Sequence, residues 1–438
     1  MPAPHLHLAA FLIAGNGAHS HALWRHPKSQ LGGFLDPDYW IKIAATLERG
    51  FFDIAFFADR LAMSDRYGGA LETGARYGDQ DATRLDPIPV LSLLAGTTRH
   101  IGLAATRSTT YHHPFHIART FATLDHLSRG RAAWNVVTSV NEGEARNHGL
   151  DRHLEHDARY DSAEEFMQTT FGLWDSWEPD ALVLDREQGI YADPARIHRL
   201  GFEGKTYRSY GPLNVPRSPQ GHPVIIQAGA SARGKAFAGK WAEVIFVVQP
   251  TLEGMQRSYR DIKEEAQRAG RRPEEVTVLV AVMPFVGRTS AEAREQLEEH
   301  NELVHPLVGL STMSSHMNFD FSTLPLDAPL EDIQVQGMQG MLSAVRNLEG
   351  GSAVTLREIG KRYGQSVVVP QVAGTADEVA DRLEHWFKQG ACDGFMVSPA
   401  HLPHGFDDFV TLVVPELQHR GLFRTAYTGS TLRENLRS

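Results

Sequence analysis

Cysteine is almost absent from this chain of 438 residues, where Cys392 is the single example. A lone thiol cannot form an internal disulfide and does not have the spacing of a cysteine metal site, so a reducing compartment fits best. Positive charge is also scarce: 43 Lys and Arg stand against 53 Asp and Glu, which gives a formal net charge of -10. An excess of negative charge opposes binding to nucleic acid or to an anionic membrane.

Long hydrophobic runs are missing too, because no stretch approaches the roughly 18 apolar residues that span a bilayer. The apolar run Leu6–Ile13 lies near the N-terminus, but no cluster of Lys or Arg precedes it as in a secretory signal. We therefore expect a soluble, cytoplasmic protein without a membrane partner. Hydrophobic residues make up 42% of the chain, enough for a sizeable buried core.

Short apolar runs alternate with longer amphipathic segments, the pattern of successive βα units around a parallel sheet. Eight parallel strands imply a closed (β/α)8 barrel, known as a TIM barrel, more readily than an open sheet. We predict these strands at Leu6–Ile13, Asp53–Ala58, Ile101–Ser108, Ala132–Ser139, Val224–Ala228, Val244–Val248, Val276–Phe285 and Gly394–Ser398.

Helix boundaries between these strands are marked by typical residues. Asp36-Pro37 and Asp86-Pro87 each place a proline behind an aspartate cap, so a helix is predicted to begin at each. Gly50 and Gly130 stand between a helical stretch and the next strand, where a left-handed glycine would end the helix.

Two stretches interrupt the alternation, at about 174–221 and about 310–351. We interpret the chain as one barrel domain over 1–438 with these two insertions in its loops. The Gly, Ser and Met content of the second suits a lid over an active site, although a plain surface excursion gives the same composition.

Polar residues at strand ends are the first candidates for a site, because barrel enzymes place their active sites at the carboxyl ends of the strands. Asp59 ends the second strand, Thr106 lies in the third, and Asn135 lies within the apolar fourth. A buried Asn must find hydrogen-bond partners, which the edge of a ligand can supply. Asp59 is equally compatible with a salt bridge, and Thr106 with a local hydrogen bond.

The most specific pattern is PVIIQAGAS followed by ARGKAFAGKWAE, which reads as strand, small-residue turn and helix. Gly229 and Ala230 allow backbone N–H groups to approach a phosphate, and the Ser231 hydroxyl can donate to it. Arg233 can clamp the charge. An ordinary βα turn in which Ser231 caps the helix explains the same residues.

Histidines number 22, and His19 and His21 follow the first strand as an H-x-H pair. Such a pair also occurs in metal-dependent barrel hydrolases. His19 lies several residues beyond the strand, however, and the eighth strand ends VSPAHLP without an Asp to activate a metal-bound water. We therefore predict no metal site.

Six ordered segments together resemble one known family: FFADR, TTRHIGLAATRSTTYHHPFHIAR, GRAAWNVVTS, HDARYDSAEEF, VIIQAGASARG and GTADEVADRL. They resemble the bacterial luciferase-like flavin monooxygenases, within them the group of nitrilotriacetate, dibenzothiophene-sulfone and long-chain alkane monooxygenases. The similarity runs from about residue 5 to about residue 428. It implies a TIM barrel, noncovalent reduced FMN from a separate NAD(P)H-dependent flavin reductase, O2 as co-substrate, and a homodimer or homotetramer.

The resemblance also implies roles for single residues. FMN contacts fall on residues of FFAD, AATRS, HDARY and QAGAS, and WNVVTS adds a residue that lines the flavin: Asp59, Thr106, His156, Tyr160, Ser231 and Asn135. The group's His-His pair before AWRHP reads HSHALWRHP here, so only His19 aligns, and His19 is our candidate for proton transfer. The expected activity is FMNH2-dependent oxidation of a small organic substrate. Deazaflavin-dependent hydride transfer, or flavin binding without catalysis, are the alternatives.

Overall fold

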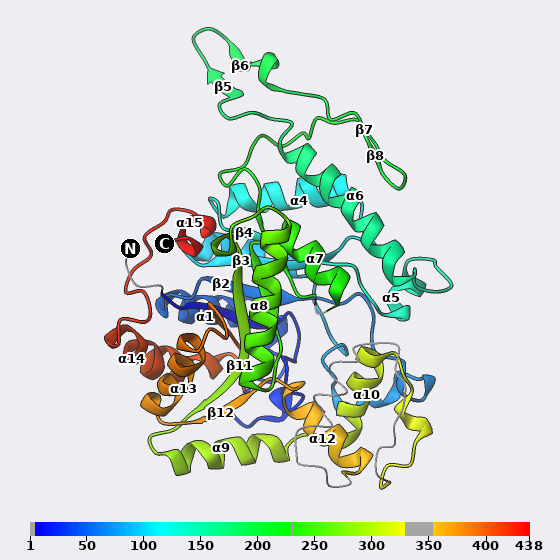
Figure 1. The fold of residues 1–438 in the computed structure, drawn as a ribbon, viewed down its shortest axis with the longest axis vertical. Helices are drawn as coiled ribbons and strands as arrows, with labels where there is room; N and C mark the ends of the chain where they lie inside the picture. The colour runs from blue at the N-terminus through cyan, green and yellow to red at the C-terminus, as the bar shows by residue number, and fades with distance from the viewer. Residues whose placement is uncertain (1–4, 230, 329–353) are drawn as a thin grey trace.

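The protein is described here by a computed structural model that covers residues 5–229, 231–328 and 354–438 (Figure 1). At its centre parallel strands pair in the order β10-β9-β4-β3-β2-β1-β13-β11, and β10 also pairs with β11, so the barrel is closed. The strands are β1 (His7–Ile13), β2 (Ile54–Ala58), β3 (Gly102–Ser108), β4 (Ala132–Val137), β9 (Val224–Gln227), β10 (Val244–Val247), β11 (Thr277–Val286) and β13 (Gly394–Val397). These are the eight predicted strands, and the predicted (β/α)8 barrel is confirmed.

The barrel strands are mostly apolar because both of their faces are covered. Every residue of β1, β3, β9 and β13 is buried, as expected for parallel strands with side chains in the barrel on one face and helices on the other. The register of β3 against β4 sets Thr106 beside Asn135. Two polar side chains therefore meet inside an otherwise apolar barrel wall.

Helices surround the barrel as an outer layer (Figure 1). Asp36 and Asp86 accept hydrogen bonds from the first turns of α1 and α3, so both predicted helix starts are confirmed. The outer helices are α1 (Pro37–Arg49), α3 (Pro87–Thr97), α4 (Pro114–Leu127), α6 (His156–Trp174), α7 (Ala232–Trp241), α8 (Leu252–Arg268), α13 (Ala376–Lys388) and α14 (Val414–His419).

The two glycines predicted to end helices in the left-handed conformation differ. Gly130 has φ +83°, as predicted. Gly50 has φ -84°, so that prediction is wrong, and Phe51 takes the positive φ of 55° instead. Gly50 is required for close packing, because a Cβ there would lie 2.5 Å from a methyl carbon of Val410.

The first predicted insertion forms two antiparallel hairpins, β5 (Leu182–Asp185) with β6 (Ile190–Ala192) and β7 (Phe202–Glu203) with β8 (Arg208–Ser209). They extend from the barrel beyond α6 at the top of Figure 1. Glu165 of α6 accepts hydrogen bonds from three successive backbone N–H groups of the β7–β8 turn, which fastens that hairpin to the helix.

The second predicted insertion is described only in part, because residues 329–353 lie outside the described residues. Its first helix, α10 (Pro306–Met317), begins ahead of the predicted boundary at residue 310 and packs against α12 (Leu356–Ser366). The remaining elements are β12 (Gln371–Gly374), which pairs with the end of β11, and the helices α2 (Glu72–Tyr77), α5 (Glu142–Asn147), α9 (Ser290–Glu302) and α15 (Leu432–Leu436). Within the described ranges, no helix combines the length and the apolar character that crossing a membrane requires.

Candidate functional site

The helix α10 covers the loops that follow the carboxyl ends of β1, β2 and β4. Its Thr312 hydroxyl lies 2.6 Å from Nε2 of His21, and its Ser315 hydroxyl accepts hydrogen bonds from Arg60 and Asn141, both at 2.9 Å. Thr312 and Ser315 are themselves buried. The mouth of the barrel is therefore roofed by a helix that is held by polar side chains rather than by apolar packing alone.

His19 lies beneath this roof, in the loop after β1. Its ring stacks on Phe11 of β1 with centroids 3.7 Å apart, and its Nδ1 lies 3.1 Å from the hydroxyl of Ser398, which follows β13. Burial lowers the pKa of His19 to about 3, so its imidazole is neutral at neutral pH. Because a hydroxyl both donates and accepts, Ser398 can hold either neutral tautomer, and Nε2 is the nitrogen left to give or take a proton.

Asp59 lies at the end of β2 in an ion pair. Arg107 of β3 donates to its carboxylate at 2.8 Å and also pairs with Asp86. Burial nevertheless raises the pKa of Asp59 to about 6, against the opposing effect of the nearby arginines. The salt bridge that the sequence offered as an alternative role for Asp59 is thus present. The Asp59 carboxyl also exchanges a proton just below neutral pH.

Thr106 and Asn135 form a short hydrogen-bonded chain between β3 and β4. Thr106 donates to the backbone carbonyl of Phe57 at 2.9 Å and accepts from Nδ2 of Asn135 at 2.8 Å. Oδ1 of Asn135 is buried without any partner. A buried polar atom without a hydrogen bond is costly, so this oxygen points to a ligand that donates to it.

The corner between β9 and α7 contains the residues predicted to hold a phosphate. Ser231 caps α7, because its side chain accepts from the backbone N–H of Gly234 at 3.0 Å. The alternative prediction, that Ser231 is a helix cap, is therefore confirmed. A Cβ on Gly234 would lie 2.8 Å from the Tyr160 hydroxyl, and one on Gly229 would lie 2.5 Å from the Gln227 side chain. A side chain at either position would press on these side-chain tips, so the two glycines keep this corner open.

The structure brings three of the predicted FMN contacts, His156, Tyr160 and Ser231, together from α6 and the start of α7. Nε2 of His156 lies 3.4 Å from the Ser231 hydroxyl, and the ring of Tyr160 lies 5.1 Å from that of His156. Arg233 is at the same corner but is exposed and paired with Asp161 of α6. Ala230 lies outside the described residues.

His21 does not join His19. Its Nδ1 lies 3.1 Å from the carbonyl of Gly364 in α12, and its Nε2 contacts Thr312 of α10. Burial lowers its pKa to about 4. Both ring nitrogens are engaged, so His21 fastens α10 and α12 to the loop of His19. Among the residues that the structure describes, no three His, Cys, Asp or Glu side chains gather as a metal site.

Sequence reasoning missed several residues of this mouth. Arg107 pairs with Asp59, Ser398 holds His19, and buried Gln227 accepts from the N–H of Gly229 at 3.2 Å. Each is a polar residue in or directly after a barrel strand, the same signal that singled out Thr106 and Asn135. Asp59 and Thr106 also line one cavity together with Arg107, Ser108, His112, Val137, Ser139, Glu144 and Leu61.

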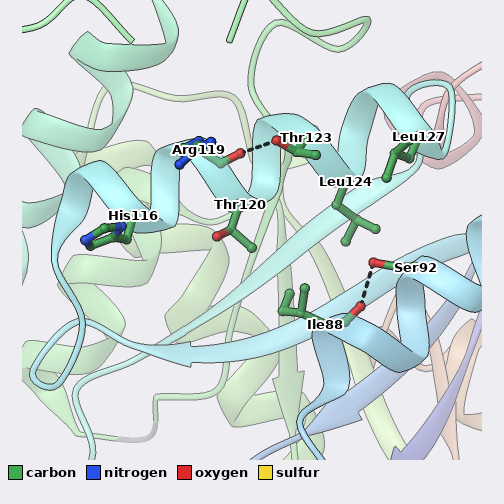
Figure 2. Close-up of a pocket in the computed structure, with 8 residues that line it drawn as sticks. All are labelled: Ile88, Ser92, His116, Arg119, Thr120, Thr123, Leu124 and Leu127. Carbon is green, nitrogen blue, oxygen red and sulfur yellow. Dashed lines mark hydrogen bonds between the residues drawn. The ribbon is translucent and has the colours of Figure 1, made fainter. Parts of the chain in front are cut away.

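A larger hollow of about 300 Å³ lies away from the mouth, between α3 and α4 on the outside of the barrel (Figure 2). The hydroxyls of Ser92 and Thr123 donate to carbonyls of their own helices, Ile88 and Arg119, at 2.9 and 2.8 Å. These two hydroxyls are thus satisfied within their own helices. None of the predicted site residues lines it.

Known proteins resemble this chain over nearly its whole length. The family model described as luciferase-like monooxygenase matches residues 14–393. A dibenzothiophene-sulfone monooxygenase of Rhodococcus erythropolis (strain XP) is 51% identical over 98% of this chain and 96% of its own length. Component A of the nitrilotriacetate monooxygenase of Aminobacter aminovorans is 41% identical over 97% of this chain and 95% of its own. The crystal structure of a riboflavin lyase with modified FMN and riboflavin superposes with a TM-score of 0.90 at 34% identity, over 99% of this chain and 96% of the lyase.

Proposed function

This chain belongs to the luciferase-like monooxygenase family and is a flavin-dependent monooxygenase, and from that premise we propose that it oxidises a small organic substrate with O2 and reduced FMN. A separate NAD(P)H-dependent flavin reductase supplies the FMNH2, and the chain works as a homodimer or homotetramer. The observation on which the proposal depends is the arrangement of an unpartnered Asn135 oxygen and an open, glycine-lined corner at one end of the same barrel.

The residues at the mouth fit a flavin ring. A flavin edge presents N–H and C=O groups, and the buried Oδ1 of Asn135 requires a donor. Asp59 and Thr106 lie on the two neighbouring strands and line one cavity. We assign these three residues to the ring.

The β9–α7 corner fits the phosphate of FMN. The dipole of α7 and its free N–H groups favour an anion at the helix start. The Ser231 hydroxyl accepts from Gly234, and its own proton has Nε2 of His156 as an acceptor at 3.4 Å, a long contact that a phosphate oxygen can replace. We assign Gly229, Ala230 and Ser231 to the phosphate, with His156 and Tyr160 beside it, while Arg233 supports it less directly because it pairs with Asp161.

Bound reduced FMN supplies the electrons that activate O2. The protein's own contribution is to position the reactants, to exclude water and to move a proton. The neutral imidazole of His19 can hold or release a proton at Nε2, since Ser398 holds Nδ1. Helix α10, through Thr312 and Ser315, closes the mouth against solvent.

The wall around His19 supports an aromatic or otherwise apolar substrate. Phe11 lies 5.8 Å from Phe56 and 5.9 Å from Phe246, measured between ring centroids, and Phe246 lies 5.9 Å from the His19 ring. Rings at these distances form an aromatic cluster, against which an aromatic or other apolar substrate would pack beside His19. With a dibenzothiophene-sulfone monooxygenase at 51% identity, dibenzothiophene sulfone is the first substrate to test.

Oxygen uptake coupled to product formation tests the proposal. The purified chain is mixed with FMN, a flavin reductase, NADH and dibenzothiophene sulfone, and O2 consumption and product are followed together against a reaction without the chain. Product in proportion to O2 supports the proposal. Product with a deazaflavin and no O2 would establish hydride transfer instead, and tight FMN binding without turnover on any substrate would establish flavin binding alone.

A further inference from the structure

Three buried polar groups without partners lie together where the loop after β3 faces the first turn of α6. They are the hydroxyl of Tyr111, Nε2 of His153 and Nε of Arg159. The Tyr111 and His153 rings lie 5.7 Å apart, and Nη1 of Arg159 lies 3.4 Å from Nδ1 of His153. No residue of this cluster belongs to the ring or phosphate contacts assigned above.

Arg159 is the unusual member because its charge is buried without an ion-pair partner. The residue is 8% exposed, and no carboxylate of the described chain lies within ion-pair distance of it. Glu155 and Glu144 are near enough to act on Arg159 electrostatically, but neither forms an ion pair with it. The Glu144 oxygens accept instead from the backbone N–H groups of Leu61 and Asn141. Burial lowers the pKa of Arg159, yet a guanidinium stays charged in proteins. Burying a charge without a partner is strongly unfavourable, which makes a missing anion the simplest resolution.

The three groups all present donors. A guanidinium cannot accept a hydrogen bond, so Nδ1 of His153 is the acceptor toward Arg159 and Nε2 carries the proton. The Tyr111 hydroxyl is held in place by its ring, which stacks on His148 at 4.4 Å between centroids. A phenol O–H, an imidazole N–H and a guanidinium N–H are the donors that recognise an oxyanion.

We propose that Tyr111, His153 and Arg159 form an oxyanion-binding site for a carboxylate, sulfinate or phosphate group. Arg159 and Tyr160 are neighbours on α6, but Tyr160 contacts the α7 side, where its ring lies 5.7 Å from that of Phe237. Arg159 instead faces the β3 loop through Tyr111 and His153. The site therefore lies beside the β9–α7 corner, next to Glu144 of the cavity that Asp59 lines.

Two sources can bring such a group to this place: the phosphate of the nucleotide, or an acidic group of the substrate or product. The inference deepens the proposed function and rests on it for the source of the anion, but the oxyanion site itself is tested by binding alone. Inorganic phosphate, benzenesulfinate, FMN and riboflavin serve as probes, because riboflavin lacks the phosphate of FMN.

The experiment compares the full-length protein with Arg159→Met, Tyr111→Phe and the control Arg152→Met, using calorimetric titration and thermal unfolding. Arg152 lies in the same segment but is exposed, so it matches the loss of charge without touching the cluster. We expect phosphate or benzenesulfinate to raise the Tm of the wild type. Their affinity should fall at least tenfold in Arg159→Met and several-fold in Tyr111→Phe, and stay unchanged in Arg152→Met.

The probes separate the two sources. If the anion is the nucleotide's phosphate, Arg159→Met loses about tenfold in FMN affinity and keeps its riboflavin affinity. If it is an acidic group of substrate or product, FMN affinity stays and benzenesulfinate affinity falls. The proposal is overturned if Arg159→Met binds all four probes as tightly as the wild type does. It is also overturned if this variant has a lower Tm but still binds oxyanions, because Arg159 would then have a structural role. Oxyanion binding in a chain that takes up neither FMN nor O2 would instead contradict the proposed function alone.

Discussion

Asn135 donates its amide to the Thr106 hydroxyl at 2.8 Å and leaves its own carbonyl oxygen buried without a partner. The pair arises because β3 and β4 place these two residues side by side in register. Thr106 passes the hydrogen bond on to the carbonyl of Phe57, so β2, β3 and β4 are linked through one polar chain. The end of that chain is where a ligand completes the hydrogen bonding.

Removing the free oxygen should weaken FMN binding. We expect Asn135→Ala to reduce the affinity for FMN by about 1–3 kcal/mol, because the flavin would lose one hydrogen bond in a buried place. Anaerobic fluorescence titration with photoreduced FMN measures it. Asn301→Ala is the control, because it removes a side-chain amide of α9 that pairs with Gln371 of β12, outside the proposed site. Equal affinities of the two variants would remove Asn135 from the flavin site.

The Ser231 hydroxyl should act on the phosphate specifically. Ser231→Ala is expected to weaken FMN binding by about 1–3 kcal/mol, the range of one charge-assisted hydrogen bond, and to leave riboflavin binding unchanged. The substitution also removes the cap of α7, which costs about 1 kcal/mol of stability.

Thr251→Ala matches that second effect, because Thr251 caps α8 by accepting from Gly254 N–H at 3.1 Å. Both variants should lose similar stability in urea unfolding, but only Ser231→Ala should lose FMN affinity. A loss of riboflavin affinity as large as that of FMN would place the phosphate elsewhere.

The sequence predicted the barrel well because burial on both faces leaves a strong trace. Every residue of β1, β3, β9 and β13 is buried and most of them are apolar. Asp36 and Asp86 mark the starts of their helices through local hydrogen bonds that need no other part of the chain. Gly50 shows where local reasoning failed. Its reason for being glycine is the approach of Val410, which only the folded structure reveals.

In the candidate site, too, local patterns were predicted from the sequence, whereas contacts between distant segments were not. His156 and Ser231 are 75 positions apart in sequence, and only the family resemblance put them in one site before the structure placed them 3.4 Å apart. The pairing of Asp59 with Arg107 was not predicted, because ion pairs between neighbouring strands depend on register. His21 was ambiguous for the same reason, since its partners Thr312 and Gly364 lie in segments distant in sequence.

Asp59 should make stability depend on pH near its own titration. Because burial raises its pKa to about 6 from 3.8, the folded state holds this proton more tightly than the unfolded state. Stability due to Asp59 is therefore present below pH 4 and lost as the pH rises to about 6, by up to about 3 kcal/mol.

Urea unfolding of Asp59→Asn at pH 4.5 and pH 7 measures this. The difference in unfolding free energy between the variant and the wild type should shift in favour of the variant when the pH is raised from 4.5 to 7. Asp38→Asn, in the exposed first turn of α1, is the control and should show no such gain. A constant difference between Asp59→Asn and the wild type would contradict the raised pKa.

His19 should affect turnover more than binding. We expect His19→Gln to lower kcat by about 10²–10⁴-fold, the range for loss of a proton-transfer group, with FMN affinity unchanged. The ratio of product to O2 consumed should also fall in this variant. His116→Gln, in the exposed hollow between α3 and α4, is the control. A His19→Gln variant with full kcat would transfer the proton role to another group.

Acid should unfold the protein through its buried, neutral histidines. Burial lowers the pKa of His19, His300 and His401 to about 3. An unfolded histidine binds a proton below about pH 6.5, so the free energy of unfolding falls as the pH falls below that value, by about 1.4 kcal/mol per pH unit for each.

His401 is the most suitable of the three histidines for a test of this pH dependence. Its Nδ1 is buried without a hydrogen bond, so a substitution breaks no hydrogen bond at that nitrogen. Its ring lies 4.7 Å from that of His26, and Lys28 and His404 add to the lowering of its pKa while Asp407 opposes it. His401→Gln should reduce the slope of unfolding free energy against pH between 4 and 6 by about one proton. His385→Gln, which removes an exposed histidine of α13, should keep the full slope. If the unfolding free energy of His401→Gln and of the wild type changed with pH at the same slope, His401 would bind its proton equally in the folded and unfolded states, which would contradict its lowered pKa.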